Sequence, residues 1–185
     1  MATSKPTIST SFLYETFEET LDIKPLGAKL HIGIPKETAF QENRIALTPE
    51  AVGVLVSNGN EVSIEHLAGE GSHYSDADYS EAGAKIVFDR HEIFKCPILV
   101  KSAPIVAEDL PLLQLNQIII SPIHYSALQQ ADIQKMMEKK ITALSFENFK
   151  DASGTYPIVR SMSEIAGSAV MLIAAQYLSS FNKGK

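Results

Sequence analysis

Three side chains that can bind or protonate a small acid occur in separate parts of this chain. Arg44 lies in a polar loop, Lys101 ends an apolar segment, and His124 directly follows another apolar segment. Arginine can hold a carboxylate through two parallel hydrogen bonds, lysine offers a compact positive charge, and imidazole exchanges protons near neutral pH. These residue types predict a site for a small carboxylate that carries a group able to gain or lose protons.

Taken singly, two of these residues have an ordinary structural interpretation. A lysine at the end of a buried strand is often only the first solvated residue, which fits Lys101 as well as a binding role does. A lone histidine such as His124 is more often structural than catalytic. The functional interpretation therefore depends on whether the fold brings the three side chains together. We expect little acid near them except Glu65 and Glu147.

Strand-like and helix-like segments alternate along the chain. The pattern predicts helices that begin at Thr48-Pro49-Glu50 and at Ser75, and two more over residues 107–114 and 127–139. Strands are predicted at residues 30–34, 61–65, 85–88, 97–101, 117–121 and 141–146.

This alternation is typical of βαβ units, and it predicts an α/β fold. We expect a Rossmann-like or flavodoxin-like parallel sheet with helices on both faces and a long C-terminal connecting helix. The carboxyl ends of parallel strands share one edge, where ligands bind in open α/β sheets. Arg44, Lys101 and His124 each follow a different predicted strand, so they should converge at that edge.

The glycine-containing loop Gly69-x-Gly71 is not a dinucleotide fingerprint, because Tyr74 stands where a third glycine is required. Two glycines in a tight turn explain this loop without a nucleotide. The five histidines show no zinc-ligand spacing, and we predict no metal site.

Composition limits the classes of function. The chain has 185 residues and a net charge of −6, which argues against nucleic acid as a partner. The longest apolar run, residues 169–175, is too short to span a bilayer, so we expect no membrane association. The single cysteine, Cys96, fits a buried position in a protein of a reducing compartment, and we expect a cytoplasmic location.

The two ends of the chain differ from its middle. Residues 1–29 form an N-terminal extension, either a strap on the domain or a subunit contact. Near the other end, Ser161 and Glu164 have the spacing of a capping box, which predicts a helix from residue 161. That helix is apolar nearly all round, so we expect another domain or subunit to cover it.

Several segments resemble the alanine dehydrogenase and pyridine nucleotide transhydrogenase family. The similarity runs from about residue 30 to the end, in the order of the family. The segments are Ile-Pro-Lys-Glu at 34–37, Glu-Asn-Arg-Ile-Ala-Leu-Thr-Pro-Glu at 42–50, Ile-Ile-Ile-Ser-Pro-Ile-His at 118–124 and Met-Ser-Glu-Ile-Ala-Gly at 162–167.

The resemblance implies roles for four residues. Arg44 and Lys101 would bind substrate, His124 would be the general acid and base, and Ser163 would contact the dinucleotide. One departure is that Ser102-Ala103 separates Lys101 from Pro104, where the family has a single acidic residue.

The same resemblance implies the N-terminal part of an NAD-dependent alanine dehydrogenase, a homo-oligomer that interconverts L-alanine with pyruvate and ammonia. Residues 30–160 would be an incomplete substrate-binding domain. Residues 161–185 would connect it to an absent domain that binds most of the NAD, so this chain alone should be inactive. The alternatives are the corresponding part of an NAD(P) transhydrogenase alpha subunit, a saccharopine-type enzyme, and a non-enzymatic module for carboxylate binding or assembly.

Overall fold

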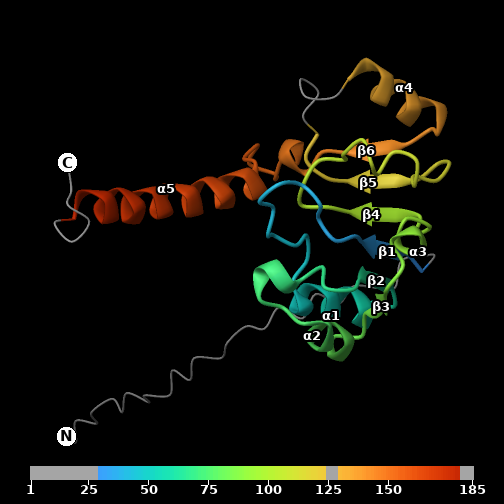
Figure 1. Cartoon of the computed structure of the whole chain (residues 1–185), viewed down its shortest axis with the longest axis horizontal. Helices are drawn as coiled ribbons and strands as arrows, with labels where there is room; N and C mark the ends of the chain where they lie inside the picture. The colour runs from blue at the N-terminus through green and yellow to red at the C-terminus, as the bar shows by residue number, and fades with distance from the viewer. Residues whose placement is uncertain (1–28, 124–128, 180–185) are drawn as a thin grey trace, which may run out of the picture.

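A six-stranded parallel sheet forms the centre of the computed structural model, which describes residues 29–123 and 129–179. The strand order is β3-β2-β1-β4-β5-β6, as in Rossmann-like sheets, so the predicted fold class is confirmed (Figure 1). The strands are β1 (His31–Ile34), β2 (Glu61–Glu65), β3 (Lys85–Val87), β4 (Ile98–Val100), β5 (Ile118–Ile120) and β6 (Thr142–Leu144).

Successive strands are added to the sheet first on one side of β1 and then on the other. This strand pairs with β2 on one side and with β4 on the other, Gly33 facing Ser63 and Leu99. The chain thus adds β2 and β3 outward on one side before it returns to add β4, β5 and β6. Such a reversal opens a crevice at the carboxyl ends of the two central strands, β1 and β4.

The helices follow the predicted pattern with two exceptions, the segment over residues 107–114 and the start of the last helix. They are α1 (Pro49–Ser57), α2 (Asp76–Glu81), α3 (Arg90–Ile93), α4 (Gln130–Glu138) and α5 (Pro157–Leu178), with short 3₁₀ turns η1 (Glu70–Ser72) and η2 (Phe146–Asn148). The start of α1 is as expected, since the Thr48 side chain accepts a hydrogen bond from the Ala51 N–H and Pro49 is the first helical residue.

The helix predicted over residues 107–114 is wrong. Residues 107–112 form consecutive turns instead, with hydrogen bonds from Asp109 N to Val106 O (3.0 Å) and from Leu112 N to Asp109 O (2.9 Å). Pro111 has no N–H to donate and blocks a helical ladder through this segment. Asp109 is fully buried, which an exposed helix would not require.

The core is divided between the two faces of the sheet, as predicted. Leu99 and Ile119 are in register and point to one face, where they pack with Ile93 and Phe94 of the α3 region. On the other face α1 and α2 cover the strands, with this cluster: Ile34, Val52, Val62, Ile64 and Tyr79. The prediction that Cys96 is buried is also confirmed, at 2% exposed. A side chain at Gly33 would come within 2.9 Å of Cys96, so these two residues require each other to be small.

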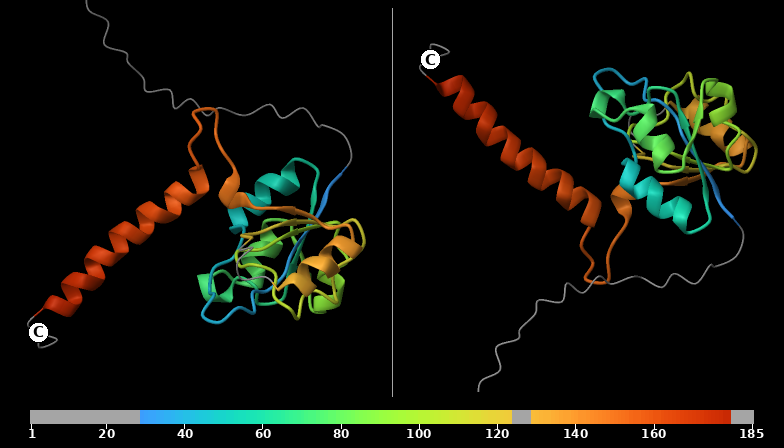
Figure 2. Two further views of the ribbon diagram at one scale, coloured as in Figure 1. Left: turned by 90° about the horizontal axis from the view of Figure 1, so that it is seen from above. Right: turned by 90° about the horizontal axis from the view of Figure 1, so that it is seen from below.

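The long helix α5 extends away from the sheet, as two perpendicular views show (Figures 1 and 2). It begins at Pro157 rather than at Ser161, because proline is favoured at the first helical position. The predicted capping box is therefore wrong. Ser161 Oγ donates to Pro157 O (3.0 Å) inside the helix, and Glu164 pairs with Arg160 (2.8 Å).

α5 exposes large apolar side chains. Leu172 is 73% exposed and Ile165 71%. By length and composition the helix is able to cross a bilayer, since its 22 residues include a window of mean hydropathy 1.4. Our expectation that no segment reaches this length is wrong. One such helix is weak grounds for a membrane protein, because helices that pack inside soluble proteins meet the same criteria.

Candidate functional site

The loop that carries Arg44 is fixed to the glycine-containing loop after β2. Ser72 Oγ donates a hydrogen bond to the backbone oxygen of Asn43 (2.8 Å). A Cβ at Gly71 would lie 2.8 Å from the same oxygen, so only glycine permits this approach. Gly69 is equally confined, since a Cβ there would lie 2.8 Å from the backbone oxygen of Tyr74, so close packing accounts for both glycines of this loop.

Arg44 is half-exposed and is held by a neighbouring carboxylate. Its Nε and Nη2 donate to the two oxygens of Glu42 at 2.8 and 2.5 Å, and its backbone N donates to Glu42 Oε1 at 3.0 Å. The hydrogen bonds from Arg44 lower the pKa of Glu42, and the same side-chain bond raises the pKa of Arg44. Within the described residues, Arg44 Nη1 has no hydrogen-bond partner, which leaves that corner of the guanidinium for a ligand.

Lys101 is almost completely buried, with its side chain 1% exposed. Its Nζ forms ion pairs with Glu37 Oε2 (2.9 Å) and Asp109 Oδ2 (3.2 Å). Glu37 Oε2 makes no aligned hydrogen bond, so its contact with Lys101 is a charge interaction. The expectation of little acid at this edge is therefore wrong, because two buried carboxylates adjoin the lysine.

The backbone after Lys101 is fixed by the same glutamate. The N–H groups of Ser102 and Ala103 both donate to Glu37 Oε1, at 2.6 and 3.1 Å. These are the two residues that separate Lys101 from Pro104. Glu37 therefore connects the loop after β1 to the loop after β4 and sets the course of the chain there.

Arg90 links these acids to a third one. Its Nη2 donates to Asp109 Oδ1 (2.7 Å), and its Nη1 donates to Glu65 Oε2 (2.9 Å) and to the backbone oxygen of Lys36 (2.9 Å). Arg90 also lies over the ring of Phe94, 5.1 Å from its centroid. We refer to Glu37, Glu65, Arg90, Lys101 and Asp109 as the buried ionic network.

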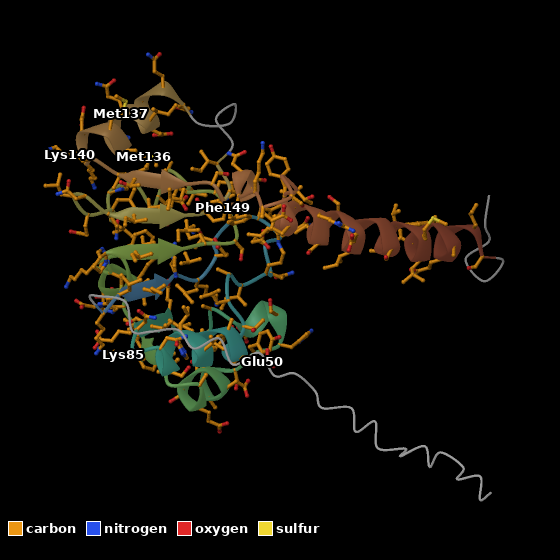
Figure 3. The ribbon with its side chains drawn as sticks, turned by 180° about the vertical axis from the view of Figure 1, so that it is seen from behind. Glu50, Lys85, Met136, Met137, Lys140 and Phe149 are labelled. Atoms are coloured by element: carbon orange, nitrogen blue, oxygen red, sulfur yellow. The ribbon has the colours of Figure 1, made fainter. Side chains whose placement is uncertain are left out.

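A cavity of about 480 Å³ lies at the carboxyl edge of the sheet, and both Arg44 and Lys101 line it. Phe149, at the edge of the sheet from which α5 departs, forms part of its wall (Figure 3). The remaining wall is mostly apolar: Ile32, Ile45, Ala46, Leu47, Leu55, Val100, Ser102, Ile120, Phe146, Ile158 and Met162.

Of the other two predicted site residues, only Ser163 lies in the described part of the chain, and it is not among the residues that line this cavity. His124 lies outside the described residues. Ser163 lies on α5, next to the cavity-lining Met162, and its Oγ donates to Val159 O (2.8 Å). Among residues 29–123 and 129–179, no group of three or more His, Cys, Asp or Glu side chains is arranged to hold a metal ion.

Sequence reasoning named Glu65 at this edge but missed the other two acids of the buried ionic network, Glu37 and Asp109. Glu37 belongs to the Ile-Pro-Lys-Glu run, so its presence in a conspicuous motif could have drawn attention to it. Asp109 gave no such signal, because the helix wrongly predicted over residues 107–114 made it one acid among exposed helical residues. Arg90 lies in the short helix α3, whose sequence carries no sign of a contact with acids at the end of β2 and after β4.

The model of the family described as "Alanine dehydrogenase/PNT, N-terminal domain" matches residues 33–166. The chain belongs to the alanine dehydrogenase/PNT family. Arg44 and Lys101 both lie within the region matched, as does the whole sheet from Gly33 onward.

Curated relatives in this family carry the name alanine dehydrogenase. The chain is 34% identical over 155 residues to that of Staphylococcus epidermidis, which covers 84% of this chain and 42% of the relative. It is 33% identical over 153 residues to that of Staphylococcus saprophyticus, covering 83% of this chain and 41% of the relative. The chain thus spans about two fifths of the length of these alanine dehydrogenase/PNT proteins.

Two solved structures are similar to this chain in fold. A structure titled L-alanine dehydrogenase matches with a TM-score of 0.76 and 31% identity, over 80% of this chain and 41% of that one. A transhydrogenase from Sinorhizobium meliloti matches with a TM-score of 0.58 and 25% identity, over 63% of this chain and 35% of that one. The alanine dehydrogenase is therefore the more similar of the two.

Proposed function

We propose that this chain is the N-terminal, substrate-binding part of an NAD-dependent alanine dehydrogenase that interconverts L-alanine with pyruvate and ammonia. One observation carries the proposal beyond family membership: cations that follow two separate strands, Arg44 and Lys101, line one cavity at the carboxyl edge of a parallel sheet. A small α-keto or α-amino acid has the carboxylate that such a pair would bind.

The roles proposed for the side chains follow from their chemistry. Arg44 would bind the substrate carboxylate through its Nη1 corner, while Glu42 holds the rest of the guanidinium in place. Lys101 would place a positive charge next to the keto oxygen. His124 would act as the general base that activates the water attacking the imine. The contribution of the two cations is chiefly orientation of the substrate.

NAD would supply the hydride acceptor when bound. Ser163 is the residue of this chain that we propose to contact it. Its hydroxyl donates to Val159 O yet keeps oxygen lone pairs that accept hydrogen bonds, and it lies on the exposed helix α5 beside the cavity wall. This fits a peripheral contact, with most of the cofactor held by another domain.

The proposed organisation has three parts. Residues 1–29 are an N-terminal extension, residues 30–160 the substrate-binding domain, and residues 161–185 a connection to a nucleotide-binding domain. The exposed apolar surface of α5 supports this division, because such a surface requires cover in water. We further propose a cytoplasmic homo-oligomer without nucleic-acid or membrane partners.

Arg44→Ala tests the proposal directly. Loss of the guanidinium should raise the Kd for pyruvate about tenfold or more, because a charge-assisted contact contributes roughly 1.5–3 kcal/mol. Isothermal titration calorimetry on the full-length protein that contains this chain measures the effect. Arg160→Ala, which removes an exposed arginine from α5, is the matched control and should leave the Kd unchanged. An unaltered Kd in Arg44→Ala would exclude Arg44 from substrate binding.

A further inference from the structure

The other residues of the buried ionic network surround the Lys101 ammonium and limit where it can lie. A lysine side chain is flexible and carries a single compact charge, so on its own it does not define where its ammonium lies. Here the side chain is 1% exposed and its Nζ contacts two carboxylates. These two ion pairs hold the ammonium within the network, and Lys101 also lines the cavity.

Asp109 connects Lys101 to Arg90 through its two carboxylate oxygens. Its Oδ2 faces Lys101 at 3.2 Å while its Oδ1 accepts a hydrogen bond from Arg90 at 2.7 Å. The side chain is completely buried. A buried carboxylate with a cation on each oxygen has little freedom to turn, because either movement would leave a charge uncompensated.

Arg90 fixes this bridge to the sheet. The same guanidinium binds Glu65 at the end of β2 and the backbone oxygen of Lys36 after β1. Glu65 also accepts a hydrogen bond from the Lys36 N–H (2.8 Å). Arg90 therefore holds Asp109, a residue of the turns after β4, in a fixed position relative to the carboxyl ends of β1 and β2.

We propose that Asp109, held by Arg90, is a positioning residue that fixes the Lys101 ammonium at the cavity wall. This inference rests on the proposed function, in which Lys101 contacts the substrate. Asp109 acts through Lys101 and does not itself touch the ligand, since it is not among the residues that line the cavity.

A double-mutant cycle on pyruvate binding tests the inference with the full-length protein. The variants are Asp109→Asn, Lys101→Met and the combination, with Kd measured by calorimetry and folding by circular dichroism. Asp109→Asn should raise the Kd about tenfold, since a charge-assisted contact is lost. In the Lys101→Met background the same substitution should change nothing more. Asp132→Asn removes the acid of an Asp–Lys pair on α4 and is the matched control.

Arg90→Lys is the second variant, in case Asp109→Asn does not fold. It keeps the positive charge but cannot hold Asp109 and Glu65 together, because lysine lacks the planar fork. It should also raise the Kd, and only when Lys101 is present.

The outcomes separate this inference from the proposed function. An unchanged Kd in Lys101→Met would remove Lys101 from substrate binding, and the inference with it. A raised Kd in Lys101→Met but not in Asp109→Asn would overturn the inference alone. Equal effects of Asp109→Asn with and without Lys101 would show that the aspartate acts independently and would equally overturn it.

Discussion

At the scale of single residues, Tyr79 shows how burial couples a side chain to pH. The residue is fully buried in α2, and its hydroxyl donates to Leu47 O (2.9 Å). Loss of hydration raises its pKa to about 12 from an ordinary value of 10.0. The folded state therefore retains a proton that the unfolded state releases, and stability should fall as the pH rises from about 10 to about 12.

Tyr79→Phe isolates this effect. At pH 8 the variant should be less stable by about 1 kcal/mol, because the hydrogen bond to Leu47 is lost. At pH 11 the difference should shrink, because the wild type alone loses stability through ionisation of this tyrosine. Urea unfolding at both pH values measures it, with Tyr177→Phe on the exposed part of α5 as control. A difference that stays constant with pH would contradict the account.

His124→Ala tests the proposed general base in the full-length protein. Without the imidazole, turnover of L-alanine should fall by about 10²–10⁴-fold, the usual contribution of general acid–base catalysis. The Kd for NAD should change little, since we assign the histidine to proton transfer and not to cofactor binding. Steady-state kinetics and a separate NAD titration distinguish the two quantities. Unchanged kcat would remove His124 from the mechanism.

The sequence predicted the cations of the candidate site better than their surroundings. Arg44 and Lys101 could be placed because each follows an apolar strand, and parallel strands share their carboxyl edge. Their partners could not be placed in the same way. Glu42 pairs with Arg44 because of the conformation of their loop, which the sequence does not report. Asp109 contacts Lys101 because the turns that carry it follow a path set by tertiary contacts.

At the scale of elements, burial separates β4 from α5. Leu99 in β4 is completely buried in the core, whereas Leu172 in α5 is 73% exposed. Leu99→Ala should therefore cost about 2–5 kcal/mol of unfolding free energy, through lost apolar contact and the cavity left behind. In the 185-residue chain by itself, Leu172→Ala, the same chemical change, should alter the free energy of unfolding by less than about 0.5 kcal/mol. Urea titrations compare the two, and equal losses would show that α5 is packed in solution.

Element boundaries were predictable where local chemistry decides them. Thr48 and Pro49 define the start of α1 with a capping hydrogen bond and a fixed φ angle, and the structure has both. The start of α5 was predicted four residues late because Ser161 and Glu164 imitate a capping box, while Pro157 was overlooked. The length of β4, three residues, follows from pairing with its neighbours, which no local pattern reports.

At the scale of the whole molecule, the fold class was predictable because hydrophobic periodicity alternates along the chain. The order of strands was not, since several orders satisfy the same pattern. The surface that packs against α5 was not predictable either, because the sequence of the helix does not identify it. The family match and the similarity to an L-alanine dehydrogenase structure identify the family and the fold. The chain spans about two fifths of the length of its relatives, so its activity by itself has to be measured.

The 185-residue chain alone should form no NADH from L-alanine and NAD, because we assign most of the cofactor contacts to another domain. Absorbance of NADH at saturating substrate measures this, with the full-length protein as the positive control. Turnover by the isolated chain at a rate comparable to that control would refute the division into a substrate-binding part and a nucleotide-binding part.

The position of β1 between β2 and β4 has a consequence for how this molecule can change. Segments that leave the sheet at those strands diverge, so the opening between them is a property of the backbone path. Replacement of Ile45 or Phe149 at the wall would change the shape of the cavity, while the strand order would stay the same. The range of ligands that the cavity accepts can therefore change by single substitutions, without a change in the fold.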